Sequence, residues 1–141
     1  MILERLTPSH IMAINLQPAQ QFALGLLTPE YASQIVEQRG VGWTAMHEGR
    51  PIACAGIVEA WEGRGLAWAL FSEQALRHFT SIHRAARNVL ADAPWRRIEM
   101  TVDATHEQGI RWAQRLGFEQ EGLMRSYTRD GRDCYLFARL K

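Results

Sequence analysis

The side chains that could carry acid–base chemistry lie in or beside segments with the pattern of strands. Glu59 and Glu62 close an apolar run, and Glu99 and Asp103 are four residues apart in an alternating segment, which puts them on one face of a strand. His106 follows soon after, and a histidine can exchange a proton near neutral pH. We predict Glu59, Glu99 and His106 as catalytic residues, the two carboxylates as candidate general bases and the histidine as an acid or base. The alternatives are carboxylates that face solvent and a histidine in a surface or capping position.

Motifs for other chemistries do not accompany these residues. The sequence has no serine-nucleophile, HExxH or Walker pattern, and HEQGIR at 106–111 has Arg111 where a zinc motif needs its second histidine. Cys54 and Cys134 are too few for a disulfide framework and too far apart for a CxxC motif. We therefore predict no metal site and a reducing compartment.

Capping and turn signals predict the elements of the first half of the chain. Thr7 and Thr28 each precede a proline, the pattern that opens a helix, and the second helix stops near Gly40. The apolar run 66–71 is typical of a central strand covered on both faces. The strands predicted in this half are 1–6, 41–46, 51–61 and 66–71, the middle two forming a hairpin.

The second half begins with a long amphipathic helix. Apolar residues recur at intervals of three and four over 72–91, and residues 97–103 then alternate as a strand should. Thr105 with Gln108 has the spacing of a capping box for the next helix. The exposed face of the long helix is basic, either as a solvated surface or as a binding patch.

The end of the chain has a helix stop followed by a hairpin. Gly117 can close the preceding helix in a left-handed conformation while Phe118 packs back on its last turn. The strands 121–127 and 133–140 then turn around an Asp-Gly pair. These elements predict an α/β (α+β) fold in a single domain, 1–141, with a mixed, twisted sheet of about six to seven strands flanked by helices.

The segment THEQGIRWAQRLGFEQEG, residues 105–122, resembles the signature of the GNAT superfamily, a helix ending in Leu116-Gly117-Phe118 before a strand that carries Glu121-Gly122. The order of the predicted elements is also similar to that of the superfamily. The resemblance implies an acetyl-CoA-dependent N-acetyltransferase that transfers acetyl to a small-molecule or protein amine. It also implies that the pantetheine arm of acetyl-CoA pairs along the strand Leu66–Phe71.

The same resemblance gives the cofactor-binding residues. GNAT proteins join the central strand to the long helix by a glycine-containing loop whose backbone amides hold pyrophosphate. That junction is SEQALR here, residues 72–77, without glycine. An alternative register places the loop at Glu62–Ala67, which contains Gly63 and Gly65. The cofactor-binding residues predicted from the first register are Trp68, Ala69, Leu70, Phe71, Ser72 and Arg77.

Two further positions differ from the GNAT pattern. Family members commonly have a tyrosine four residues before the glycine of the helix end, where its hydroxyl protonates the departing thiolate, and Ala113 occupies that position. His106 stands where the family often has asparagine. The resemblance therefore also allows an activity that has degenerated.

A narrower resemblance links WALFSEQ, the helix end and SYTRDGRDCYLFAR to GNAT-like proteins of tailed phages, including a small internal virion protein of short-tailed phages. It implies an alternative function, a non-catalytic virion-associated or host-interaction protein. Such a protein would present its tryptophans or its basic helix face to a phage or host protein. The arginines of that face are Arg77, Arg84 and Arg87.

The bulk composition limits the classes of partner. The chain has 141 residues, 47% hydrophobic and 22% charged, with a net charge of +1. This balance is that of a compact globular domain, and it argues against nucleic acid as a partner because counterion release needs a concentrated basic surface. The absence of a long apolar run and of a leader pattern at the start leads us to predict a cytoplasmic protein without a membrane partner, in the host cytoplasm or the virion if phage-encoded.

Overall fold

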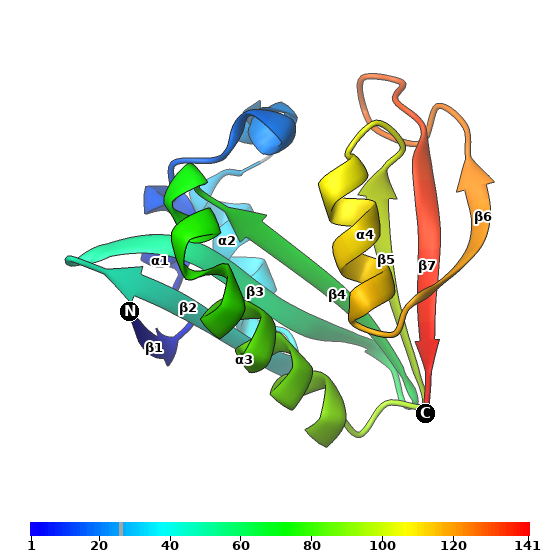
Figure 1. The fold of residues 1–141 in the computed structure, drawn as a ribbon, viewed down its shortest axis with the longest axis horizontal. Helices are drawn as coiled ribbons and strands as arrows, with labels where there is room; N and C mark the ends of the chain where they lie inside the picture. The colour runs from blue at the N-terminus through cyan, green and yellow to red at the C-terminus, as the bar shows by residue number, and fades with distance from the viewer. Residues whose placement is uncertain (26) are drawn as a thin grey trace.

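The computed structural model describes residues 1–25 and 27–141 (Figure 1). Its strands are β1 (Ile2–Arg5), β2 (Gly40–His47), β3 (Arg50–Trp61), β4 (Arg64–Phe71), β5 (Arg97–Asp103), β6 (Glu119–Met124) and β7 (Cys134–Leu140). Its α-helices are α1 (Pro8–Ala13), α2 (Pro29–Glu37), α3 (Phe79–Asp92) and α4 (Glu107–Arg115). Two 3₁₀ helices are η1 (Pro18–Gly25) and η2 (Glu73–His78).

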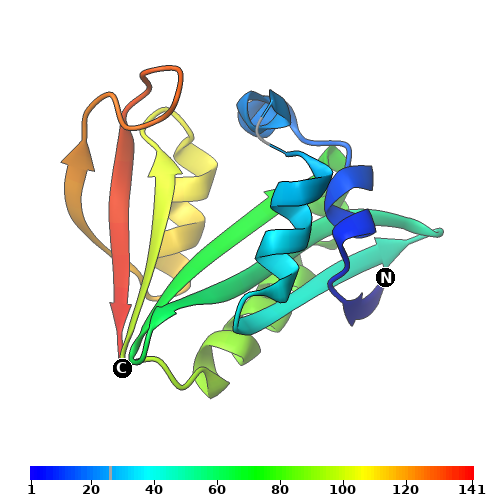
Figure 2. The same cartoon turned by 180° about the vertical axis from the view of Figure 1, so that it is seen from behind.

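The seven strands form one mixed sheet in the order β1-β2-β3-β4-β5-β7-β6. All neighbours are antiparallel except β4 and β5, which are parallel. Helices α3 and α4 cover one face of the sheet, and α1 and α2 cover the other (Figures 1 and 2). The predicted fold class is therefore confirmed. No described helix has the length and apolar character needed to cross a membrane.

The two parallel strands separate soon after they meet. Only Arg64 to Leu66 pair with β5, whereas β4 pairs with β3 as far as Phe71. Figure 1 shows the two strands together at the lower end of the sheet and apart at the upper end. The prediction that 66–71 is covered on both faces is thus wrong, because Leu66 is 39% exposed and residues 67–71 are half-buried. Beyond Leu66, one edge of β4 has no neighbouring strand.

The helix predicted over 72–91 is divided. Residues Glu73–His78 form the 3₁₀ helix η2, and α3 begins at Phe79 after His78, whose φ of −115° and ψ of 17° interrupt the helical path. The alternative register of the glycine loop is excluded, because Arg64–Phe71 is strand and Gly63 sits in the turn before it with a φ of +89°. The strand-to-helix junction is therefore Ser72–Arg77, as in the first register.

Helix ends follow their local signals with one exception. Gly117 has a φ of +92°, and the amides of Gly117 and Phe118 donate to the carbonyls of Gln114 and Ala113, which forms the predicted αL helix end. The capping box predicted at Thr105 is wrong. The Thr105 hydroxyl instead donates to Asp103 Oδ1 at 2.6 Å, because a carboxylate is a stronger acceptor than a neutral partner.

The other helix caps and the last hairpin agree with the sequence in outline. The Thr7 and Thr28 side chains accept the amides of His10 and Tyr31. The hairpin of β6 and β7 is confirmed, but β6 runs from Glu119 to Met124, earlier than the predicted 121–127. The chain enters the sheet directly after the turn at Gly117, so β6 begins at Glu119.

Candidate functional site

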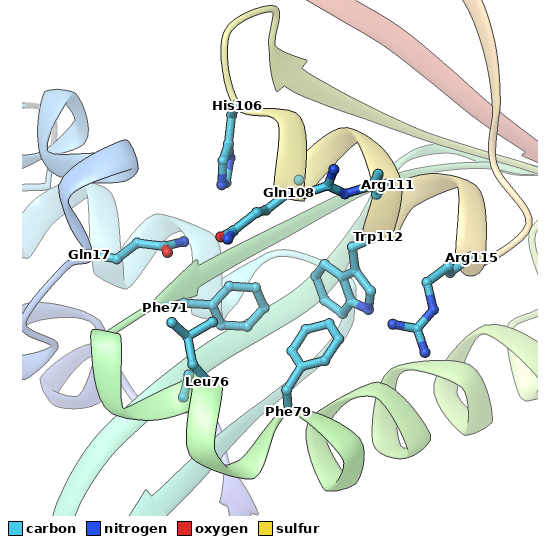
Figure 3. Close-up of a pocket in the computed structure, with 11 residues that line it drawn as sticks. Gln17, Phe71, Leu76, Phe79, His106, Gln108, Arg111, Trp112 and Arg115 are labelled. Carbon is cyan, nitrogen blue, oxygen red and sulfur yellow. The ribbon is translucent and has the colours of Figure 1, made fainter.

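A cavity of about 330 Å³ opens where β4 and β5 diverge. Its wall comes from the end of β4, from η2 and the start of α3, from α4, and from the loop after α1 (Figure 3). The residues that line it are Gln17, Phe71, Ala75, Leu76, Phe79, His106, Gln108, Gly109, Arg111, Trp112 and Arg115. Three segments distant in sequence, at residues 17, 71–79 and 106–115, therefore meet at the open end of the sheet.

Trp112 is the centre of the aromatic wall. Its ring lies 5.1 Å from that of Phe71 and 5.6 Å from that of Phe79, centroid to centroid, in tilted and edge-on geometries that favour aromatic pairs. Its Nε1 donates to His83 Nδ1 at 3.0 Å. A second cavity of about 50 Å³ lies against Ala67, Ala69 and Met100 and also has Trp112 in its wall. The indole thus borders both cavities.

The free edge of β4 is partly occupied by the side chain of Gln20. Its Nε2 donates to the Ala69 carbonyl at 2.8 Å and its Oε1 accepts the Phe71 amide at 2.8 Å. The Phe71 carbonyl accepts the Gln17 amide at 2.8 Å, and Leu16 forms an isolated bridge with Ser72. One side-chain amide therefore makes the two hydrogen bonds that a neighbouring strand would make.

Among the three predicted catalytic residues, His106 is the one that lines the 330 Å³ cavity, the larger of the two cavities that Trp112 borders. It caps α4 and packs closely on Gly109, where an added Cβ would lie 2.7 Å from its Nδ1. Burial lowers the pKa of His106, and the nearby charge of Asp103 opposes this effect. The imidazole is therefore neutral at pH 7 and can accept a proton.

Glu99 lies at the end of the sheet where β4 and β5 still pair, which we call the closed end, away from His106. Glu99 lines a separate pocket of about 530 Å³ with Arg64 and Arg97. Arg64 binds both of its carboxylate oxygens, and Arg97 Nε donates to Oε2 at 2.9 Å. The hydrogen bonds from Arg64 and Arg97 outweigh burial and lower the pKa of Glu99 to about 2. Four strand residues, roughly 13 Å, separate it from Asp103 near His106. A carboxylate this acidic and fully paired is a weak base.

Glu59 also makes structural contacts. Its Oε1 accepts Trp95 Nε1 at 3.0 Å, and its Oε2 lies 3.3 Å from Arg39 Nε. In the sheet it stands opposite Gly65, close to the point where β4 still pairs with β5. The structure thus places Glu59 and Glu99 near the closed end and does not bring them to the cavity of His106.

The predicted cofactor-binding residues on β4 lie on opposite faces of the sheet, because successive side chains of a strand alternate between the two faces. Phe71 lines the larger cavity and Ala69 the smaller one, whereas Trp68 and Leu70 pack with the cluster under α1 and α2. The buried Ser72 amide donates to the Ile52 carbonyl, and its hydroxyl has no partner among the described residues. Arg77 is exposed on η2 and is not part of the cavity wall.

The surface features behind the alternative function are only partly present. Arg77, Arg84 and Arg87 are exposed, as predicted. Trp61 is 62% exposed with the Arg64 guanidinium 4.3 Å from its ring centroid, but the other four tryptophans are buried or half-buried. Across residues 1–25 and 27–141, no group of three His, Cys, Asp or Glu side chains is placed to hold a metal ion.

Sequence reasoning missed most of the cavity wall. Arg111 and Arg115 had a usable signal, because two arginines four apart on the helix that carries the signature must share a face. Gln17 and Gln20 had none, since a glutamine in an N-terminal loop says nothing about a strand fifty residues later. Trp112 was assigned only to the apolar face of its helix.

Solved structures of the same architecture are known. A ribosomal-protein-alanine N-acetyltransferase from Brucella melitensis superposes with a TM-score of 0.76 over 100% of both chains at 15% identity. The chain has the GNAT fold. A GNAT-family acetyltransferase from Streptococcus pneumoniae gives a TM-score of 0.69 at 15% identity over 99% of both chains, and an IAA acetyltransferase from Bacillus cereus gives 0.68 at 13% identity over 99% of both.

The likeness concerns the fold alone at these identities. No protein-family model matches the sequence, and no curated protein matches it significantly. Within the GNAT fold, Ala113 is fully buried in the core beneath α4. The alanine at that position contributes packing and offers no hydroxyl.

Proposed function

We propose that this GNAT-fold chain binds acetyl-CoA in the 330 Å³ cavity and transfers the acetyl group to an amine. The observation that carries the proposal is the divergence of β4 and β5 after Leu66, which leaves a strand edge beside an apolar cavity. An extended arm with amide groups can pair with such an edge as an added strand does. The 50 Å³ cavity deeper along β4 has room for a small acyl group.

The chemistry needs one base and no covalent intermediate. The amine nitrogen attacks the thioester carbonyl carbon, the carbon–sulfur bond breaks, and the thiolate leaves. His106, neutral and on the cavity wall, takes the proton of the amine. Because Ala113 cannot protonate the thiolate, water must do so, and we expect slow turnover.

Binding of acetyl-CoA tests the proposal directly. At a concentration one hundred times its dissociation constant, the cofactor should stabilise the fold by about 2.7 kcal/mol. For a domain of this size the midpoint of thermal unfolding should rise by roughly 5–10 °C. We would measure it by differential scanning calorimetry with acetyl-CoA, with ATP as the control for a nucleotide that lacks the pantetheine arm. A midpoint that stays the same in millimolar acetyl-CoA would end the proposal.

The Gln20 contact favours a second candidate function, a non-catalytic protein on a GNAT scaffold, and its phage origin is a prediction from the sequence resemblance alone. The two backbone groups that a pantetheine arm would need, at Ala69 and Phe71, are held by the chain's own side chain. If that contact is permanent, the edge is closed and the exposed basic face or Trp61 contacts a phage or host protein instead. Mass spectrometry of purified virions tests the virion-associated version, which fails if the protein is missing from the particles.

Replacing Gln20 with alanine separates the two candidates. The loss of two hydrogen bonds should lower the free energy of unfolding by about 1–2 kcal/mol and speed hydrogen exchange of the Phe71 amide. If the edge binds acetyl-CoA, the variant should bind it about fivefold more tightly, because the competing amide is gone. Gln21, exposed beside it, provides the matched control Gln21→Ala. If the Phe71 amide exchanges faster in Gln20→Ala but the variant binds acetyl-CoA no more tightly than the wild type, the non-catalytic function is favoured.

A further inference from the structure

Two arginines of α4 stand at the rim of the larger cavity without ionic partners. Arg111 and Arg115 are exposed and line the cavity, and within the described part of the chain neither guanidinium makes a hydrogen bond or an ion pair. They flank Trp112 in Figure 3, one toward His106 and one toward α3. Arg64 and Arg97, by contrast, are paired with carboxylates.

The cavity beside them is apolar and lacks negative charge. Phe71, Phe79 and Trp112 form its aromatic wall, the exposed Leu76 lies at its edge, and none of the described residues that line it is acidic. The Arg115 Cζ lies 5.9 Å from the centroid of the Phe79 ring. Contact with an aromatic face leaves the N–H donors of a guanidinium free, and their planar fork suits a phosphate.

Arg87, exposed on α3, adds a third positive charge near the two arginines of α4. His83 accepts the Trp112 indole N–H on its Nδ1. Burial lowers the pKa of His83, and the positive charges of Arg115 and Arg87, which act on the imidazole, lower it further. The region between α3 and α4 is therefore electropositive although the whole chain carries only +1.

The junction between β4 and α3 has fewer groups that can bind an anion than α4 has. Residues 73–78 form a 3₁₀ helix, whose amides bond to carbonyls three residues back, and the Ala75 amide donates to the Ser72 carbonyl at 3.1 Å. Without glycine, side chains hinder the close approach of backbone to a phosphate. Glu73 is exposed in its first turn and adds a negative charge.

We propose that Arg111 and Arg115 form the phosphate-binding subsite of this cavity, in place of the backbone of the β4–α3 junction. The ligand class is a phosphorylated molecule with an extended, largely apolar arm, whose arm contacts Trp112 and whose phosphates lie on α4. This inference rests on the proposed function only where it identifies the ligand as coenzyme A. The subsite itself follows from the free guanidinium groups and the apolar interior.

The test compares coenzyme A with pantetheine, which has the same arm without phosphates. Isothermal titration would use the wild type, Arg111→Gln, Arg115→Gln, the double variant, and Arg84→Gln as a matched control, because Arg84 is exposed on α3 and does not line the cavity. Each single substitution should weaken coenzyme A binding about five- to tenfold, the worth of one charge-assisted contact near the surface. Pantetheine binding and the control should stay within about twofold.

Each other outcome has a defined meaning. Equal coenzyme A affinity in all variants would overturn the subsite and leave the proposed function intact. Losses of the same size for pantetheine would also overturn it, because the arginines would then act on cavity shape. If neither molecule binds the wild type, the proposed function fails, and inorganic pyrophosphate becomes the probe. If pyrophosphate binds the wild type and not the double variant, the subsite is supported. If pyrophosphate does not bind the wild type at 50 mM salt, the subsite is rejected.

Discussion

Replacing Trp112 with alanine is expected to lower the free energy of unfolding by about 3–5 kcal/mol, as for other large aromatic residues in cores. The indole is 8% exposed and packs on Phe71 and Phe79. Its removal leaves a void at the divergence of β4 and β5 and takes away the hydrogen bond to His83. Urea unfolding followed by circular dichroism measures the loss.

The same substitution should also abolish tight binding at the site. Trp112 borders both the larger and the smaller cavity, so its removal would merge them and leave an arm without its principal contact surface. We expect acetyl-CoA affinity to fall more than tenfold under conditions where the variant is still folded. Trp112→Phe keeps most of the packing and should cost about 1–2 kcal/mol, mainly the lost hydrogen bond.

A matched control exists on the surface. Trp61 is 62% exposed, and Trp61→Ala should change the free energy of unfolding by less than about 1 kcal/mol. If the two alanine variants lose equal stability, the structure is wrong about which tryptophan is in the core. If Trp112→Ala unfolds completely at 25 °C, the comparison of Trp112→Phe with Trp61→Ala still decides the point.

Replacing His106 with glutamine is expected to slow acetyl transfer about 100-fold if the proposed function holds. Burial lowers the pKa of His106 below its ordinary value, so the neutral, proton-accepting form predominates above about pH 6.5. The rate in the wild type should therefore rise with pH on the acid side and level off before neutrality. His106→Gln should lose this acid limb. Radiolabelled acetyl-CoA with a panel of small and peptide amines provides the measurement.

The controls for His106 lie elsewhere on the molecule. His47→Gln alters a histidine on β2 outside the cavity and should leave the rate unchanged. Glu99→Gln removes a paired carboxylate, so it should affect stability far more than the pH profile. An unchanged rate in His106→Gln together with a lost acid limb in Glu99→Gln would move the base to the closed end of the sheet.

Local signals in the sequence predicted elements well where one turn or cap was enough. The left-handed glycine at 117, the threonine caps at 7 and 28 and the hairpin around residues 48 and 49 all depend on neighbours within five residues. The capping box predicted at Thr105 was wrong because the position of another side chain overrode the local signal. The Thr105 hydroxyl found a stronger acceptor in Asp103, whose position depends on the end of β5.

The candidate site was predicted less completely because its parts come from distant segments. Glu59 and Glu99 looked available for catalysis, and only the sheet register shows that arginines from β4, β5 and the end of α2 surround them. His106 lines the cavity and directly precedes the signature helix, and its catalytic role stays a prediction. The basic pair on that helix was visible in the sequence, but its relation to a cavity was not.

The sequence by itself determined the order of elements, the helix end at Gly117 and the absence of glycine after β4, since each is a property of a short run of residues. Tertiary structure alone decided where β4 leaves β5, which edge groups Gln20 occupies and which charged side chains are already paired. These features depend on contacts between segments far apart in sequence, such as Gln20 with Ala69 and Phe71, which are 49 and 51 residues away. No local pattern encodes them, because long-range packing selects among many locally equivalent arrangements.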